Sequence, residues 1–308
     1  MTLIPIVRAR GGDLYASGRR ASIPAPGHSR HDRSASLLLG SSGRIVVHSF
    51  GGASVAEILA DLRKSGLIDY QGYPLGEGRS APSTPEPSET FRRQRAEALW
   101  TAGIPIRGTP SELYLKGHRA IARDVCLIAA LRHHPAMPVA IYKDVCRYSR
   151  PALMSRIAVL GDRTTAVEVT YLNAQADRDR SLRISRKTVG CVPPGTFVQL
   201  DRPDEHIVVA EGVMTALSAT ERLGLPGLAL LGIRNLQNFA PPTGVRRVSI
   251  AVDRGQAGES AAKTLEARLR DEGFEADRQF PRAPFEDFNR WAQAERALRK
   301  EEGREGMG

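Results

Sequence analysis

The chain has few cysteines, few aromatic residues and no long apolar run. Its three cysteines, Cys126, Cys146 and Cys191, are dispersed and odd in number, which argues against a disulfide framework and favours reduced thiols in the cytoplasm. No run of about 18 apolar residues occurs, so we expect no membrane span, and the N-terminal apolar stretch is too short for a secretion signal. Aromatic residues make up only 6% of the chain, which argues against base stacking as the main mode of nucleic-acid binding.

Positive charge is in excess. The chain has 44 Lys and Arg against 34 Asp and Glu, a formal net charge of +10 and a pI of about 9.9. Such an excess suits a polyanionic partner, because each neutralised phosphate releases counterions. Solubility alone can also account for it. The helicase pattern GxxxxGK[ST] is absent, so any helicase partner must be a separate protein.

Two acidic residues follow apolar stretches in the C-terminal third. Glu211 follows HIVVA, and Asp253 follows VRRVSIAV. Both patterns predict a buried parallel strand followed by a turn into a helix. Ligands bind at the carboxyl ends of such strands, where two carboxylates suit Mg²⁺. For either acid alone, a helix N-cap is an equally good interpretation.

The residues around these acids alternate between strand and helix patterns. A helix is predicted from Met214 to its end at Gly224, followed by a short strand over 227–231. A second helix is predicted from about Gly258 to Gly273, and a strand over 275–280 precedes Asp287. This order predicts an α/β fold, with a parallel sheet and crossover helices.

The same residues resemble the Toprim domain of DnaG-type primases, topoisomerases and some nucleases. VAEGVMTALSA (209–219) most resembles the corresponding sequence motif of phage- and plasmid-encoded primase-like proteins. The resemblance implies a Mg²⁺ or Mn²⁺ site formed by Glu211, Asp253 and Asp287, with Glu211 and Asp253 as catalytic residues. The family commonly has Asp-x-Asp, whereas this chain has Gly255 at the second position. One carboxylate is therefore missing unless Glu259 or Asp287 supplies it.

A proline-rich stretch separates an N-terminal module from the rest. Residues 75–90 (LGEGRSAPSTPEPSET) predict an extended linker after a module at 1–74. This small β-rich module, with strands at 34–39 and 44–50 and a helix at 55–62, resembles the zinc ribbon of primases. Only one of the four ligand positions keeps its ligand, and a structural zinc needs four, so no zinc is expected. The aligned positions are Ala25, His28, Ser49 and Ala53.

The middle segment, 91–204, resembles the α+β subdomain that precedes the Toprim domain (205–308) in DnaG-type polymerase cores. GTPSELYL (108–115) followed by Arg119 resembles one element of that subdomain, and PALM and VEVTYL resemble two of its strands. Glu168 and Val169 replace the family's usual His-Arg pair, so a basic contact is expected to be lost there.

A basic cluster lies at residues 178–187. Alternation over 182–185 predicts a strand with one basic face, and RKTVG resembles a family element that approaches template or nucleotide. The resemblance implies that Arg119, Arg186 and Lys187 hold template or triphosphate. An equally good interpretation of the cluster is a solvent-exposed edge strand whose charged side chains prevent pairing with other strands.

Two functional classes follow from these resemblances. One is a primase-type nucleotidyltransferase that makes RNA primers on single-stranded DNA from nucleoside triphosphates, in phage or plasmid DNA replication. The other is a nucleic-acid-binding accessory protein on a Toprim scaffold with weakened catalysis. A Toprim nuclease is a weaker alternative, because the middle segment matches primases.

Overall fold

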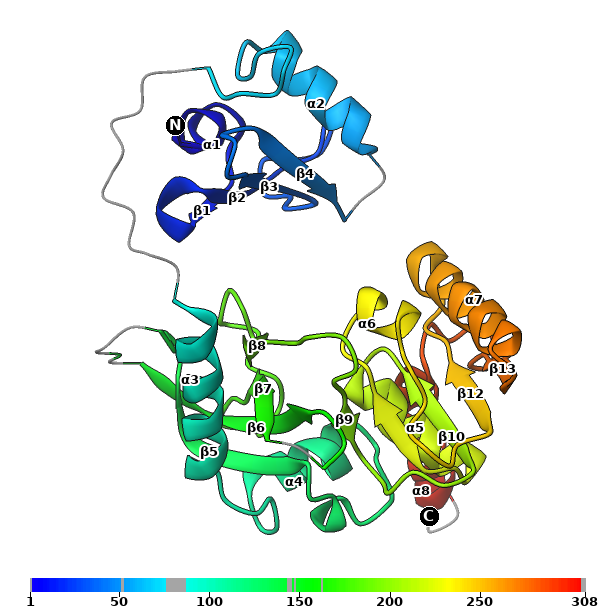
Figure 1. The fold of residues 1–308 in the computed structure, drawn as a ribbon. Helices are drawn as coiled ribbons and strands as arrows, with labels where there is room; N and C mark the ends of the chain where they lie inside the picture. Colours follow the sequence, from blue (N-terminus) through cyan, green and yellow to red (C-terminus); the bar gives the residue numbers. More distant parts are fainter. Residues whose placement is uncertain are drawn as a thin grey trace. The chain divides into compact units, whose positions relative to one another are not determined.

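The chain forms two compact units. The structure is a computed structural model that describes residues 2–50, 53–75, 87–142, 146, 148–161 and 163–305. The units are Met1–Glu86 and Pro87–Gly308 (Figure 1). Most of the predicted linker, residues 76–86, lies outside the described residues. Within the described part, no helix has the length and apolar character needed to cross a membrane.

The N-terminal unit is a four-stranded antiparallel sheet with two helices. The strand order is β1-β2-β3-β4. Alternate residues of the sheet, such as Ile23, Leu37 and Leu39, form one buried core with Ile58 and Leu62. The predicted strands and helix are present, with bounds α1 Ile4–Arg10, β1 Asp13–Tyr15, β2 Arg20–Ile23, β3 Ala35–Leu39, β4 Ile45–Ser49 and α2 Val55–Lys64.

The positions aligned with zinc ligands contact other protein groups. The Ser49 hydroxyl donates to the Ala53 carbonyl over 2.6 Å. The His28 Nδ1 atom lies 3.1 Å from the Asp32 carboxylate, which also accepts from the Ala25 backbone N–H. These contacts join Ser49 to Ala53, and Ala25 and His28 to Asp32.

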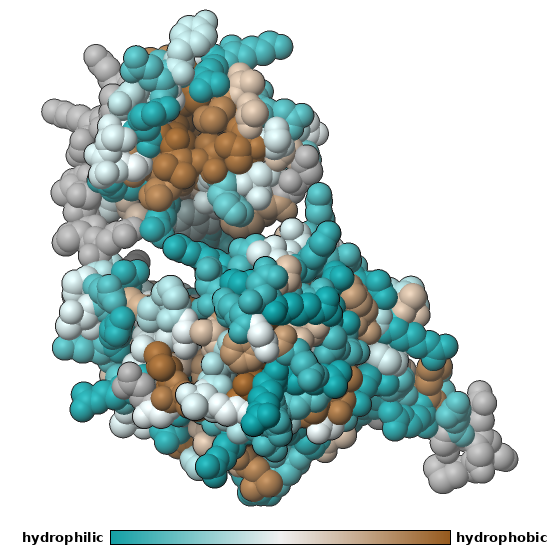
Figure 2. Space-filling model, turned by 45° about the vertical axis from the view of Figure 1, so that its right-hand side comes forward, coloured by the Kyte–Doolittle hydropathy of each residue, from teal (hydrophilic) through white to brown (hydrophobic). Residues whose placement is uncertain are grey.

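The opposite face of this sheet is partly exposed. Val46, His48 and Phe50 alternate along and beyond β4, and the His48 and Phe50 rings lie 4.5 Å apart. Val46 and Phe50 are exposed. Figure 2 shows hydrophobic atoms gathered in a patch on this unit, at the top of the view. An antiparallel sheet can leave one face to solvent in this way.

The first part of the second unit contains an antiparallel sheet of order β5-β6-β7-β8. Helix α3 packs on one face through Leu99 and Trp100, which share a core with Val167 and Val169 of β7. The bounds are α3 Glu89–Ala102, β5 Leu131–Pro138, β6 Ser149–Ala158, β7 Thr164–Tyr171 and β8 Arg186–Gly190. Between α3 and β5 lie α4 (Pro110–Leu113), a π-helical turn (Tyr114–His118) and a 3₁₀ turn (Val125–Leu127).

The C-terminal sheet has five strands in the order β13-β12-β10-β11-β9. Strands β10 to β13 are mutually parallel where they pair, and β9 is antiparallel to β11. This confirms the predicted α/β fold with a parallel sheet. The bounds are β9 Val198–Gln199, β10 His206–Ala210, α5 Val213–Leu223, β11 Gly227–Ala229, α6 Ile233–Gln237, β12 Arg247–Ala251, α7 Gln256–Asp271, β13 Glu275–Gln279 and α8 Phe288–Glu305.

Helices cover both faces of the C-terminal sheet. On one face, Val208 and Ala210 share a core with Leu217 of α5 and with Phe288 of α8. On the other face, Ile207, Val209 and Ile250 share a core with Ala262 and Leu265 of α7. Residues 208 to 210 are all fully buried, because helices cover both faces of this strand. A strand covered on both faces has a continuous apolar sequence.

Candidate functional site

Two predicted carboxylates lie where the strand order of the parallel sheet reverses. β10 leads through α5 to β11 on one side, whereas the neighbouring β12 leads through α7 to β13 on the other. The connecting helices leave on opposite faces, so a crevice opens at the carboxyl ends of β10 and β12. Glu211 follows β10 and Asp253 is the second residue after β12. The third predicted carboxylate, Asp287, directly precedes α8.

All three carboxylates line one cavity of about 300 Å³. The same cavity is also lined by residues from the preceding part of the unit, namely Arg119, Arg178, Arg186 and Glu168. We call this space the catalytic cavity, because it holds the acids that the Toprim resemblance implies to be catalytic. It places acids that suit a cation beside arginines that suit phosphate. The other lining residues are Gly212, Met214, Thr215, Leu231, Gly232 and Asn289.

Burial raises the pKa of the two strand-end acids. Burial is the main reason that the pKa of Asp253 rises to about 6, and the charges of Asp287 and Glu211 add to it. A hydrogen bond from the Thr215 hydroxyl, 2.8 Å long, and the charge of Arg186 oppose the rise. Burial also raises the pKa of Glu211, again against Arg186. A bound cation would favour the ionised form of both acids.

The arginine side of the cavity includes an acid of its own. Burial raises the pKa of Glu168, while Arg186 and Arg178 oppose the rise. The Arg186 Nε atom lies 3.9 Å from the Glu168 carboxylate, and the Arg178 Nε donates to the Ser185 hydroxyl over 2.7 Å. Glu168 therefore lies among the arginines and partly balances their charge. The sequence interpretation treated it only as a lost basic contact and missed its place in the cavity.

Helix α8 holds the segment that carries Arg119. The Asn289 amide donates to the Arg119 carbonyl over 2.6 Å and to the Ser218 hydroxyl over 2.9 Å. One and two turns further along the helix, Gln293 donates to the His118 carbonyl and Arg296 to that of Lys116. These carbonyls lie at the end of the π-helical turn, and such turns are often found at functional sites. The spacing 289, 293, 296 puts all three donors on one helix face.

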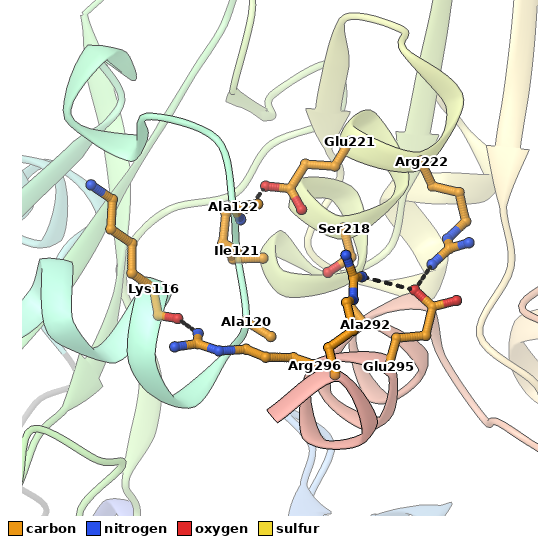
Figure 3. A pocket seen from close by; sticks show the side chains of 11 residues that line it. Lys116, Ala120, Ile121, Ala122, Ser218, Glu221, Arg222, Ala292, Glu295 and Arg296 are labelled. Atoms are coloured by element: carbon orange, nitrogen blue, oxygen red, sulfur yellow. Dashed lines mark hydrogen bonds and ion pairs between the residues drawn. The ribbon is translucent and has the colours of Figure 1, made fainter. Parts of the chain in front are cut away.

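The contact between Arg296 and Lys116 borders a second cavity of about 750 Å³ (Figure 3). Its charged groups already have partners within the protein. Glu295 pairs with Arg222 at 2.6 Å, and Arg299 lies 3.6 Å from the same carboxylate. The Glu221 carboxylate accepts from the backbone N–H groups of Ala122 and Arg123. None of the predicted site acids lines this larger cavity, so we do not assign it as the functional site despite its greater volume.

The carboxylates of the catalytic cavity suit a hydrated divalent cation. No three His, Cys, Asp or Glu side chains in the described part of the chain lie close enough to form a complete ligand set. Mg²⁺ does not need one, because it takes one or two carboxylates together with waters and phosphate oxygens. Gly255 brings no carboxylate, and the Glu259 carboxylate accepts from the Gly255 N–H at the start of α7. Glu259 is not among the residues that line the cavity.

The structure separates Arg186 and Lys187, which the resemblance implied would both hold template or triphosphate. Glu168 pairs with Thr188 and Val169 with Lys187 in the β7–β8 register, so Arg186 shares the face of Glu168. Lys187 points to the opposite face, where its ammonium donates to the Val139 carbonyl over 2.6 Å. Lys187 does not line the catalytic cavity.

The strand predicted over residues 182–185 is wrong: β8 begins only at Arg186. The Arg178 side chain bonds to Ser185 in the irregular segment before it. Alternation of polar and apolar residues there reflects turns, in which Asp179 accepts from the Ser181 N–H and hydroxyl. Sequence reasoning also missed Thr215, although it lies one helical turn after Glu211 within the Toprim-like motif.

Family comparisons match two parts of the chain. Residues 206–297 match the family model of the Toprim domain, and residues 90–200 match that of the "Domain of unknown function (DUF7146)". The Toprim match confirms the predicted Toprim domain. None of the curated proteins searched matches the chain.

Several solved structures are similar to this chain at low identity. The primase fragment of the bacteriophage T7 primase-helicase is 15% identical, with a TM-score of 0.39, over 56% of this chain and 66% of that fragment. A DNA primase domain from Pseudomonas aeruginosa is 14% identical, with a TM-score of 0.44, over 67% and 76%. The zinc-binding and RNA polymerase domains of Aquifex aeolicus primase are 12% identical, with a TM-score of 0.42, over 97% and 82%. This chain thus spans just under two thirds of the T7 fragment.

Proposed function

We propose that the protein is a primase-type nucleotidyltransferase that extends RNA primers on single-stranded DNA with nucleoside triphosphates. The observation that carries the proposal is the catalytic cavity, which is lined by three Toprim carboxylates together with three arginines. A cation site beside a phosphate site is what nucleotidyl transfer requires. We further propose that the protein works in the cytoplasm, in phage or plasmid replication, with a separate helicase.

The carboxylate wall would hold Mg²⁺ or Mn²⁺. Glu211 and Asp253 are the proposed ligands, and Asp287 completes the wall. Thr215 fixes one oxygen of Asp253 by its hydrogen bond, which leaves the other oxygen for the cation. When bound, the cation would neutralise charge on the reacting phosphate and lower the pKa of the attacking hydroxyl.

The arginine wall would bind the triphosphate. Arg119, Arg178 and Arg186 line the cavity, and each guanidinium group can donate two hydrogen bonds to the oxygens of one phosphate. The primer 3′-oxygen would form a bond to the α-phosphorus, while the bond from that phosphorus to the bridging oxygen breaks and pyrophosphate leaves. Glu211, a carboxylate that lines the cavity, is the proposed acceptor of the hydroxyl proton.

One observation favours a second candidate function, an accessory protein with weakened catalysis. Gly255 stands where the family commonly has a second acid, and the nearby Glu259 carboxylate is bonded to the Gly255 N–H. A site with one firmly held cation would bind nucleic acid and nucleotide but turn over slowly.

Primer synthesis on single-stranded DNA with Mg²⁺ or Mn²⁺ tests the proposal. The Glu211→Gln variant should lose at least about a hundredfold of the activity, because it removes a charged ligand and the proton acceptor. Glu259→Gln is the matched control, an acid near the same sheet edge but outside the cavity, and it should retain activity. DNA binding without synthesis by the wild type would support the accessory function. Cleavage of the DNA would support a nuclease.

A further inference from the structure

A smaller cavity of about 290 Å³ adjoins the catalytic cavity. The two share a wall formed by Leu231 and Gly232, the residues that follow β11. The rest of its lining combines two apolar residues, Val192 and Pro194, with three polar ones, Arg234, Asn235 and Asn238. A small concave site with apolar walls and a few polar groups is typical of ligand cavities.

We propose that this adjoining cavity, which we call the nucleoside subsite, receives the sugar and base of the nucleotide whose phosphates lie in the catalytic cavity. The proposal rests on the proposed function, because it assumes that the arginine wall binds phosphate. A nucleotide has a polyanionic end and a flat, largely apolar end with polar edges. The two adjoining cavities have the same division of chemistry.

The lining of the subsite suits a nucleobase of any sequence. Val192 and Pro194 offer apolar surface, and Arg234 is an exposed guanidinium, which stacks on aromatic faces. The Asn238 amide donates to the Arg234 carbonyl over 2.7 Å and still has a second N–H and a carbonyl oxygen that can reach a base edge or a sugar hydroxyl. Contacts of this kind tolerate all four bases, as a template-directed reaction requires.

The shared wall has an unusual backbone and is hydrogen-bonded to its surroundings. Leu231 has a φ of 60° and Gly232 a φ of 143°, and the first value is rare for a residue with a side chain. The Leu231 N–H donates to the Glu211 carbonyl over 2.7 Å, which ties the wall to the carboxylate site. Asn235 donates to the carbonyls of Thr196 and Leu230, which fixes the loop behind it. Residues held in such conformations cluster at ligand clamps, which supports a binding role.

Binding of two probes in the presence of Mn²⁺ separates the two cavities. Nucleoside triphosphates (ATP, GTP, CTP and UTP) would occupy both cavities, whereas inorganic tripolyphosphate would occupy only the catalytic cavity. We expect the wild type to bind each nucleotide more tightly than tripolyphosphate. Val192→Trp, which fills the subsite, should weaken all four nucleotides about tenfold, the low end for losing one stacked base, and leave tripolyphosphate within about twofold.

The controls keep the test decisive. Val159→Trp changes an exposed valine outside both cavities and should bind both probes like the wild type. Asn238→Ala, a truncation at an exposed position, should weaken nucleotides only, and it serves if the tryptophan variant fails to fold. Unchanged nucleotide affinity in the filled variant, or equal wild-type affinity for both probes, would overturn the subsite alone. If neither probe binds the wild type, the phosphate site and the proposed function fail with it.

Discussion

Replacing Asp253 by Asn should stabilise the metal-free protein. The pKa of Asp253 is raised from 3.8 to about 6 in the fold, mainly by burial, so its ionised form opposes folding at neutral pH. The difference is 6 − 3.8 = 2.2, and at 1.36 kcal/mol for each pKa unit it corresponds to about 3 kcal/mol. Asn keeps an oxygen that can accept from Thr215 while it removes the charge.

The sign of this effect depends on pH in a defined way. Below about pH 4, Asp253 is protonated in both states, so the variant should have no advantage. Between about pH 4 and 6 the unfolded chain loses this proton before the folded chain does, and wild-type stability falls as pH rises. Above about pH 7 the variant should be more stable by the full amount, about 3 kcal/mol.

Tryptophan fluorescence during urea unfolding, with EDTA present, measures the effect. Both tryptophans, Trp100 and Trp291, lie in the C-terminal unit, so the signal reports the unit that contains the site. Adding Mn²⁺ should then stabilise the wild type but not the variant, since a ligand stabilises the state that binds it. A variant less stable than the wild type near pH 8, or an advantage that grows toward pH 4, would refute the reasoning.

Three further predictions concern the zinc module, the basic residues and the α8 contacts. Elemental analysis should find no stoichiometric zinc, and one zinc per chain would overturn the alignment of the N-terminal module. Arg186→Ala should flatten the slope of log K for single-stranded DNA against log salt by about 0.7, whereas Lys187→Met should leave it unchanged and lower stability; equal slopes in both variants would contradict the separation of their faces. Asn289→Ala leaves the Arg119 carbonyl unpaired, so it should destabilise the C-terminal unit by about 1–3 kcal/mol in urea unfolding and weaken the binding of nucleotide by Arg119. Unchanged nucleotide affinity would contradict a positioning role for Asn289.

The carboxylate wall could be predicted because its signals are local. Glu211 and Asp253 each follow an apolar run that can only be buried on both faces, and the chain order of strands and helices brings such runs to one sheet edge. The Gly224 position, with a φ of 66°, ends α5 as the sequence indicated. The strand-end acids and the end of α5 each depend on residues close together in the sequence.

The arginine wall could be predicted only in part, because it depends on pairing between distant segments. Arg186 and Lys187 are neighbours in sequence, and only the β7–β8 register decides which of them faces the cavity. β7 is buried on both faces at seven of its eight positions, so no alternation marked Glu168 as the one that faces the arginines. Arg119 reaches the cavity from a segment held by α8, about 170 residues away in the chain.

Strand β9 has a consequence for how such proteins can exchange parts in evolution. Val198 and Gln199 precede the Toprim match, yet they form the antiparallel edge of its sheet, and Asp201 accepts from the Gly227 N–H of β11. A recombination event that joined a new partner at residue 206 would leave the edge of β11 bare, and bare edges pair with other chains. Viable exchanges must therefore carry 198–201 along with the Toprim residues, so the unit that is inherited together is longer than the unit that is recognised by sequence.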